Sequence, residues 1–195
     1  LTEKDAVRRS FGIVFQDQST DEELTCYENM EFHAVLYGLD KESRKRQIKK
    51  LLEMVGLWER RDDLVKKFSG GMKRRLEIAR GLIHHPKILF LDEPTLGLDP
   101  QTRNRIWDHI REVNKSEDMT VFFTTHYMEE AEAMAERIAI IDYGRIVADG
   151  TLEEIKSSTG EDSLEKAFLE LTGHTIRPEN GSSIDRMRLH RRMHR

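Results

Sequence analysis

The stretch from residue 68 to residue 99 constrains the fold most, because a glycine-led helix stands directly before a buried strand that ends in two acids. The apolar run Ile-Leu-Phe-Leu precedes Asp92 and Glu93, which is typical of a parallel strand with polar residues at its carboxyl edge. Before it, Ser69, Gly70 and Gly71 open a basic helix, whose first backbone N–H groups attract phosphate. The order predicts an α/β sheet that lies beside an anion site.

Composition narrows the class of protein. The 195 residues are enough to bury a core, and the net charge of -4 gives no general attraction to nucleic acid or anionic membrane. Cys26 is the only cysteine, which excludes an intrachain disulfide and fits a reducing cytosolic compartment. No apolar run is long enough to cross a bilayer, so we expect membrane attachment only through another subunit.

Apolar periodicity predicts alternating strands and helices, and therefore a sheet with helices on its faces. The expected strands are residues 11–15, 88–92 and 120–124, with helices after Thr25, after Asp40, from the Ser69 turn and after Asp99. Further along we expect a helix over 128–136, a hairpin of 138–142 and 145–148, a capping box from Thr151, and a helix over 162–171. The basic run Lys73, Arg74 and Arg75 is interpreted as a solvated helix face.

In order and spacing, these segments closely resemble the ATP-binding subunits of ABC transporters. The resemblance covers residues 11–173, and residues 162–173 are similar to the ending of the daunorubicin-resistance-type exporter branch. It implies a P-loop NTPase-like ABC ATPase core, incomplete here, with an inserted all-helical subdomain. The core would comprise residues 1–16 and 68–160, the helical subdomain 17–67, a C-terminal helix 161–175 and a basic, disordered tail 176–195.

The resemblance assigns the hydrolytic residues of an ATP site. Asp92 matches the Walker B aspartate, which associates with Mg²⁺, and Glu93 matches the general base. Neighbouring residues of a strand point in different directions, so one carboxylate can face the metal and the other the attacking water. His126 matches the switch histidine that contacts the γ-phosphate, and Gln16 the glutamine that approaches Mg²⁺ and water. Capping of a turn by the two acids and packing by the histidine are the alternative interpretations.

The resemblance also assigns residues that contact nucleotide across a dimer. Ser69, Gly70 and Gly71 match the signature motif, and Met72 replaces its usual glutamine, which removes a polar contact. Glycine allows a close approach of the backbone to an anion, although a lone Ser-Gly-Gly is more often a linker. Asp99 matches the D-loop aspartate, and as the residue before Pro100 it is also a good N-cap.

The departure from the family pattern is the missing Walker A loop. No glycine is followed by Lys-Ser or Lys-Thr, so G-x-x-x-x-G-K-[ST] is absent, and the chain begins at Leu1 without an initiating Met. We interpret the sequence as a fragment that lacks its N-terminal strands, and we expect it to hydrolyse ATP feebly or not at all by itself.

The resemblance implies an ATP-binding and ATP-hydrolysing subunit that energises an ABC transporter, of the exporter kind, with ATP and Mg²⁺ as cofactors. Its partners would be a transmembrane permease and a second ATPase subunit in a head-to-tail dimer, at the cytoplasmic face of the membrane. Two alternatives stay open: a soluble ABC-type ATPase that acts on nucleic acid or ribosomes, and a non-catalytic partner that lends its signature motif. No nucleic acid partner is expected, and the sequence does not name the transported substrate.

Overall fold

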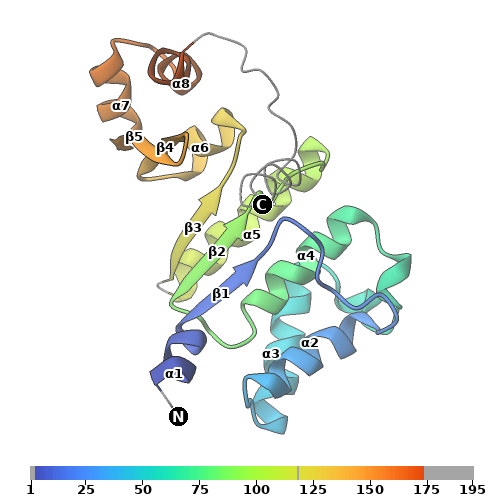
Figure 1. The fold of residues 1–195 in the computed structure, drawn as a ribbon. Coiled ribbons are helices and arrows are strands. Elements are labelled where there is room, and N and C mark those ends of the chain that lie inside the picture. Colours follow the sequence, from blue (N-terminus) through green and yellow to red (C-terminus); the bar gives the residue numbers. More distant parts are fainter. Residues whose placement is uncertain (1–2, 118, 174–195) are drawn as a thin grey trace, which may run out of the picture. The chain divides into compact units, whose positions relative to one another are not determined.

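The structure is a computed structural model that describes residues 3–117 and 119–173, and the chain forms two compact units, Leu1–Tyr127 and Met128–Arg195 (Figure 1). The elements of the first unit are α1 (Glu3–Ser10), β1 (Phe11–Val14), α2 (Cys26–Leu36), α3 (Lys41–Met54), the 3-10 turns Trp58–Arg60 and Val65–Lys67, α4 (Gly70–Gly81), β2 (Ile88–Asp92), α5 (Pro100–Glu117) and β3 (Thr120–Thr124). The three strands confirm the prediction from periodicity, whereas α1 was not predicted.

The sheet of the first unit is parallel and has the order β1-β2-β3. Val14 pairs with Leu91, and Asp92 pairs with Thr124, so the three strands end level with one another. Because the strands are parallel, the residues that follow them meet at one edge of the sheet. This carboxyl edge therefore receives Gln16, the two acids and the segment that leads to His126.

Helices α4 and α5 cover one face of this sheet (Figure 1). Leu89 and Leu91 on that face are 0% and 1% exposed. The backbone of β1 approaches the end of α4 so closely that a Cβ atom at Gly12 would lie 2.3 Å from the carbonyl oxygen of Gly81. Only glycine at position 12 allows this packing without a shift of backbone.

The opposite face of the sheet is aromatic and open. Phe90 lies at its centre, with ring centroids 6.1 Å from Phe11 and 5.6 Å from Phe122. Ile13 and Phe122 are 41% and 57% exposed on this face. Parallel sheets normally bury both faces, so this surface, which we call the open sheet face (Phe11, Ile13, Phe90 and Phe122), has the character of a core.

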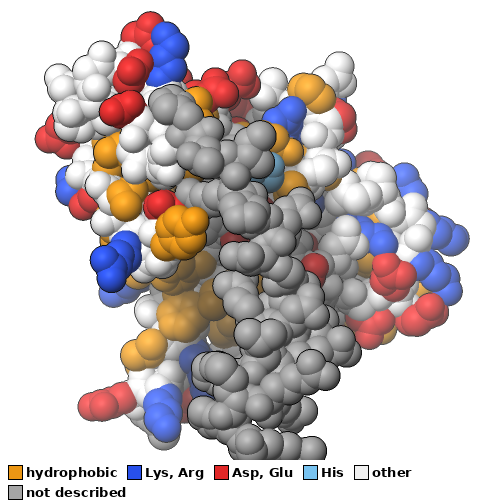
Figure 2. Space-filling view, turned by 45° about the horizontal axis from the view of Figure 1, so that its top comes forward, with side chains coloured by type: hydrophobic (Ala, Val, Ile, Leu, Met, Phe, Trp, Pro, Cys, Tyr) orange, Lys and Arg blue, Asp and Glu red, His pale blue; other side chains and the backbone are white. Residues whose placement is uncertain are grey.

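The helices between β1 and α4 form the part that was predicted as a helical insert. Thr25 and Glu28 form the expected capping box of α2, and Asp40 caps α3. Ile48, Leu51 and Leu52 of α3 are at most 3% exposed, as their i, i+3, i+4 spacing predicts. On the right-hand part of Figure 2, on the side of α2 and α3, basic and acidic side chains are interspersed.

The second unit contains a β-hairpin with helices packed against it. Its elements are α6 (Met128–Met134), β4 (Ile138–Asp142), β5 (Arg145–Gly150), α7 (Leu152–Thr159) and α8 (Leu164–Thr172). The core consists of Ile138, Ile140, Ile155, Leu164 and Ala167. The hairpin and both amphipathic helices confirm their predictions, and α6 ends two residues earlier than expected.

The predicted tail 176–195 lies outside the described residues, and the predicted division into core and helical subdomain stays a prediction. Among the helices that the structure describes, none combines the length and the apolar character needed to cross a bilayer.

Acid should destabilise the first unit through His33 of α2. Burial, followed by the nearby charges of Arg80 and His84, lowers the pKa of His33 from its usual 6.5 to about 4. Between pH 6.5 and about pH 4, His33 binds a proton in the unfolded chain but stays neutral in the folded chain. The free energy of unfolding is therefore unaffected by this group above pH 6.5 and decreases as the pH falls toward 4. We expect urea midpoints of the wild type to fall over this range more steeply than those of His33→Gln. Equal pH dependence of the two proteins would contradict this.

Candidate active site

The end of β2 and the turn after it carry both predicted acids, and we call residues 92–94 the acidic turn. A side chain at the end of β3 forms hydrogen bonds with both acidic residues. The hydroxyl group of Thr124 donates to Asp92 Oδ1 at 2.5 Å and accepts from the backbone N–H of Glu93 at 3.0 Å. Glu93 has a φ of +46°, which few non-glycine residues adopt and which is common at functional turns. One side chain of the neighbouring strand therefore orients the carboxylate of Asp92 and holds the backbone of Glu93.

His126 completes this cluster. Its Nδ1 lies 2.9 Å from Oε2 of Glu93, and the glutamate side chain is 20% exposed whereas that of the histidine is 54% exposed. A carboxylate only accepts hydrogen bonds, so the proton of the pair belongs on Nδ1 and the imidazole orients the carboxylate. The structure thus brings Asp92, Glu93 and His126 together at the carboxyl edge of the sheet.

Gln16 reaches the same edge from β1. It is exposed and follows Phe15, which lies one residue beyond the pair of Val14 and Leu91. It therefore follows β1 at the carboxyl edge of the sheet, and its contact with Mg²⁺ and water stays a prediction.

Sequence reasoning missed Arg74, the residue that joins these loops. Its guanidinium donates to the carbonyl oxygens of Phe15 at 2.5 Å, Asp92 at 2.6 Å, Glu93 at 3.1 Å and Pro94 at 2.8 Å. The residue is 6% exposed. One buried side chain of α4 therefore binds the backbone before Gln16 and the backbone of the acidic turn.

The interpretation of residues 73–75 as a solvated helix face was wrong. The side chain of Lys73 is 14% exposed and pairs with Glu22, and Arg75 donates to the carbonyl oxygen of Val55 at 2.6 Å. A run of charges on a helix does not reveal which of its members face carbonyl groups of other segments. A signal was present in Glu77, three residues after Arg74, which supplies a buried counter-charge.

The start of α4 has the geometry of an anion site. Ser69 caps the helix by accepting from the N–H of Met72 at 3.3 Å, and both Ser69 and Gly70 are exposed. Nothing lies within 4 Å of a Cβ atom placed on Gly70, so an incoming group can approach this backbone. A Cβ atom on Gly71, in contrast, would lie 2.7 Å from the methyl group of Thr102.

Thr102 connects Asp99 with this helix start, because it packs against Gly71 and forms hydrogen bonds with Asp99. Thr102 donates to Asp99 from its hydroxyl group at 2.6 Å and from its backbone N–H at 3.0 Å. These hydrogen bonds, the side-chain one first, hold the pKa of the Asp99 carboxyl below its usual value. Asp99 is therefore the N-cap of α5, and with Ser69, Gly70 and Gly71 it forms a second group of predicted site residues.

The acidic turn fits a magnesium ion that is held together with phosphate. Within residues 3–117 and 119–173, no three His, Cys, Asp or Glu side chains are grouped so as to hold a metal by themselves. Mg²⁺ usually takes one or two carboxylates and completes its shell with water and substrate phosphates. Asp92, exposed at the strand end and oriented by Thr124, provides a ligand of that kind.

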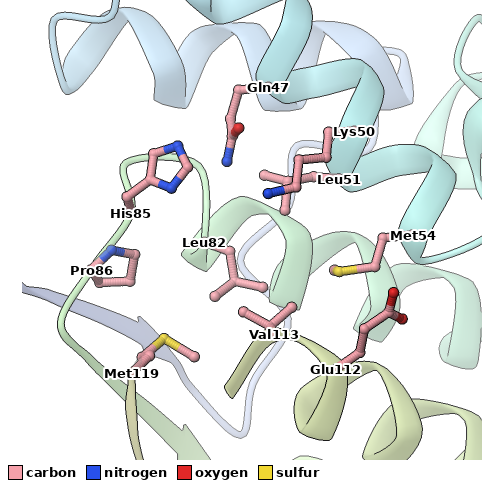
Figure 3. Close-up of a pocket in the computed structure, with 10 residues that line it drawn as sticks. All are labelled: Gln47, Lys50, Leu51, Met54, Leu82, His85, Pro86, Glu112, Val113 and Met119. Carbon is pink, nitrogen blue, oxygen red and sulfur yellow. The ribbon is translucent and has the colours of Figure 1, made fainter. Parts of the chain in front are cut away.

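A cavity of about 240 Å³ lies elsewhere in the first unit (Figure 3). It is lined by side chains of α3, of the segment between α4 and β2, of α5 and of the residue before β3: Gln47, Lys50, Leu51, Met54, Leu82, His85, Pro86, Glu112, Val113 and Met119. Pro86 and Met119 precede β2 and β3, so the cavity is at the amino edge of the sheet and separate from the acidic cluster.

Comparison with known proteins agrees with the chemistry of this cluster. The model of a family described as ABC transporter matches residues 2–96. The daunorubicin/doxorubicin resistance ATP-binding protein DrrA of Streptomyces peucetius is 44% identical over 84% of this chain and 49% of that protein. The Nod factor export ATP-binding protein I of Rhizobium sp. (strain N33) is 41% identical over 74% of this chain and 47% of that protein. The chain thus spans about half the length of the curated relatives it matches.

A solved structure of the ATP binding subunit of an ABC transporter has a similar fold. The TM-score is 0.76 at 29% sequence identity, over 88% of this chain and 72% of that chain.

The two glycines at the start of α4 should respond differently to alanine. Gly71→Ala forces Thr102 away from Asp99, so we expect the free energy of unfolding to fall by about 1–3 kcal/mol. Gly70→Ala enters open space and restricts the unfolded chain, so it should leave stability unchanged or raise it by up to about 1 kcal/mol. Urea denaturation of the two variants and the wild type measures both values, and equal losses would contradict the packing described above.

Proposed function

We propose that this chain, which belongs to the family of ABC transporter ATP-binding domains, is part of an ATP-hydrolysing subunit that energises an exporter. The family and the fold class expected from the sequence are thereby confirmed. Names of relatives that include drug resistance and Nod factor export support the direction of transport. The identity of the substrate belongs to the permease and is not part of this proposal.

The contact between Glu93 and His126 is the observation that carries the proposal. In ATP hydrolysis a water attacks the γ-phosphate, and a base must accept its proton. Glu93 is oriented by His126 at 2.9 Å and stands beside Asp92, so a base and a metal ligand lie together at one sheet edge. When bound, Mg²⁺ would neutralise phosphate charge through Asp92, with Gln16 alongside. A non-catalytic subunit that only supplied its signature motif to another subunit would not require the pair of Glu93 and His126.

The phosphate loop has to come from outside these 195 residues, since G-x-x-x-x-G-K-[ST] is absent. The open sheet face supports this part of the proposal, because its aromatic side chains require a further layer. We propose that the segment with the phosphate loop packs there. The exposed start of α4 and Asp99 would serve a second ATPase subunit, in the head-to-tail arrangement that the resemblance implies.

The permease would bind on α2, at the membrane surface on the cytoplasmic side. Phe32, Val35 and Leu36 follow the i, i+3, i+4 spacing of one helix face and are 58%, 52% and 63% exposed. Met30 and Ala34 of the same helix are fully buried, so the exposed side chains are carried by an anchored helix. An exposed apolar stripe on such a helix is typical of a protein interface. The interspersed charges on that side of the unit (Figure 2) favour a protein partner over nucleic acid.

ATP hydrolysis tests the catalytic part of the proposal. The isolated 195-residue chain should turn over ATP at background rate, because it lacks a phosphate loop. In the product of the complete reading frame, co-expressed with its permease, Glu93→Gln should lower kcat by about 10²–10⁴ because the proton acceptor is lost. The exposed Glu129→Gln is the matched control and should leave kcat unchanged.

Two outcomes would overturn these statements. Robust turnover by the isolated chain that Glu93→Gln abolishes would refute an external phosphate loop. Unchanged kcat in Glu93→Gln of the complete product would refute Glu93 as the base.

Co-purification tests the permease surface. The double variant Phe32→Asp with Leu36→Asp should lose the permease, while its stability stays within about 0.5 kcal/mol, since both side chains are exposed. Lys45→Asp with Lys49→Asp on the exposed side of α3 is the control and should retain the permease. Retention by the α2 variant would exclude this helix as the docking surface.

A further inference from the structure

Helix α4 presents polar side chains to the active-site loops at successive turns. Arg74, Glu77 and Arg80 are spaced by three residues, so they form one stripe along the helix. Arg74 is 6% and Glu77 is 2% exposed, and the two form an ion pair at 3.3 Å. A buried ion pair of this kind is costly unless further hydrogen bonds satisfy it, and here the partners are backbone groups of two loops.

The first loop is the segment that contains Gln16. At its start, Arg74 binds the carbonyl oxygen of Phe15, and at its end Glu77 accepts from the N–H of Ser19 at 2.5 Å. Arg80 donates to the carbonyl oxygen of Ser19 at 2.7 Å and also to its hydroxyl group. The stripe therefore holds both ends of the five-residue span Phe15–Ser19, which contains Gln16.

The second loop is the acidic turn. Arg74 binds three successive carbonyl oxygens there, of Asp92, Glu93 and Pro94. The unusual φ of Glu93 costs free energy and persists only where the surroundings fix the backbone. The planar guanidinium presents several rigidly oriented N–H donors and can bind these carbonyl oxygens at the same time. A lysine ammonium group lacks this fixed geometry.

We propose that Arg74, Glu77 and Arg80, which we call the α4 brace, are positioning residues that keep Gln16 and Glu93 in register with the helix that begins at Ser69. The inference rests on the proposed function. Ser69 and Gly70 are exposed at the start of the same helix, so the brace also joins the acidic turn to the helix start at which a phosphate would bind.

Hydrogen exchange on the 195-residue chain tests the brace without any need for activity. In Arg74→Met, the amides of Ser19, Glu93, Thr95 and Leu96 should exchange about tenfold faster, the factor expected when a local opening loses a hydrogen bond. Arg75→Met is the matched control on the adjacent position, because Arg75 binds Val55 instead. It should leave these amides unchanged. Unchanged exchange in Arg74→Met, or equal acceleration in both variants, would overturn the brace.

A second variant covers the case in which Arg74→Met does not fold. Arg74→Met with Glu77→Leu removes both buried charges, and such replacements are often neutral for stability. It should fold and still show faster exchange at the amides of Ser19, Glu93, Thr95 and Leu96. A folded double variant with wild-type exchange would overturn the proposal.

Steady-state kinetics of the complete product with its permease separates positioning from simple stabilisation. Arg74→Met should lower kcat about ten- to a hundredfold at constant KM, because the base is displaced while the nucleotide still binds. Arg74→Lys should recover only part of this loss, and Arg75→Met should retain the wild-type kcat. A loss confined to KM would overturn the positioning role. Absence of ATPase activity in the wild type would count against the proposed function alone, and the exchange data would then decide the brace.

Discussion

Parallel pairing of β1, β2 and β3 is the constraint on which the rest of the first unit depends. It brings the ends of three strands, which are remote in the sequence, to a single edge. The hydroxyl group of Thr124 can then orient Asp92 and hold the backbone of Glu93, and His126 can reach the Glu93 carboxylate. A shift of register by one residue would turn Asp92 away from Thr124 and remove the cluster.

Much of this arrangement could be predicted, because the decisive signals are local. Apolar runs that end in acids, glycines that follow a cap, and i, i+4 stripes each report the structure of their own segment. They identified the three strands and the buried face of α3, whereas the grouping of Asp92, Glu93 and His126 followed from the resemblance to ABC transporter subunits. Chemistry at strand ends follows from the same reasoning, since parallel strands collect their carboxyl ends.

What could not be predicted depends on partners far along the chain. Arg74 is separated by 59 residues from Phe15, whose carbonyl oxygen it binds, and no periodicity marks a backbone acceptor. A basic residue on a helix has the same appearance in the sequence whether it faces water or four carbonyl groups. The lowered pKa of His33 is of the same kind, because it depends on burial and on Arg80, which lies on another helix.

The exposed rings of the open sheet face affect how the isolated chain behaves in solution. Phe90 contacts both Phe11 and Phe122, so the three rings form a continuous apolar strip across the sheet. The hydrophobic effect favours burial of such a strip against a complementary surface. In concentrated solution, the open sheet faces of two copies can pack against each other. Reversible self-association that weakens on dilution or in mild detergent is therefore the expected behaviour of these residues in isolation.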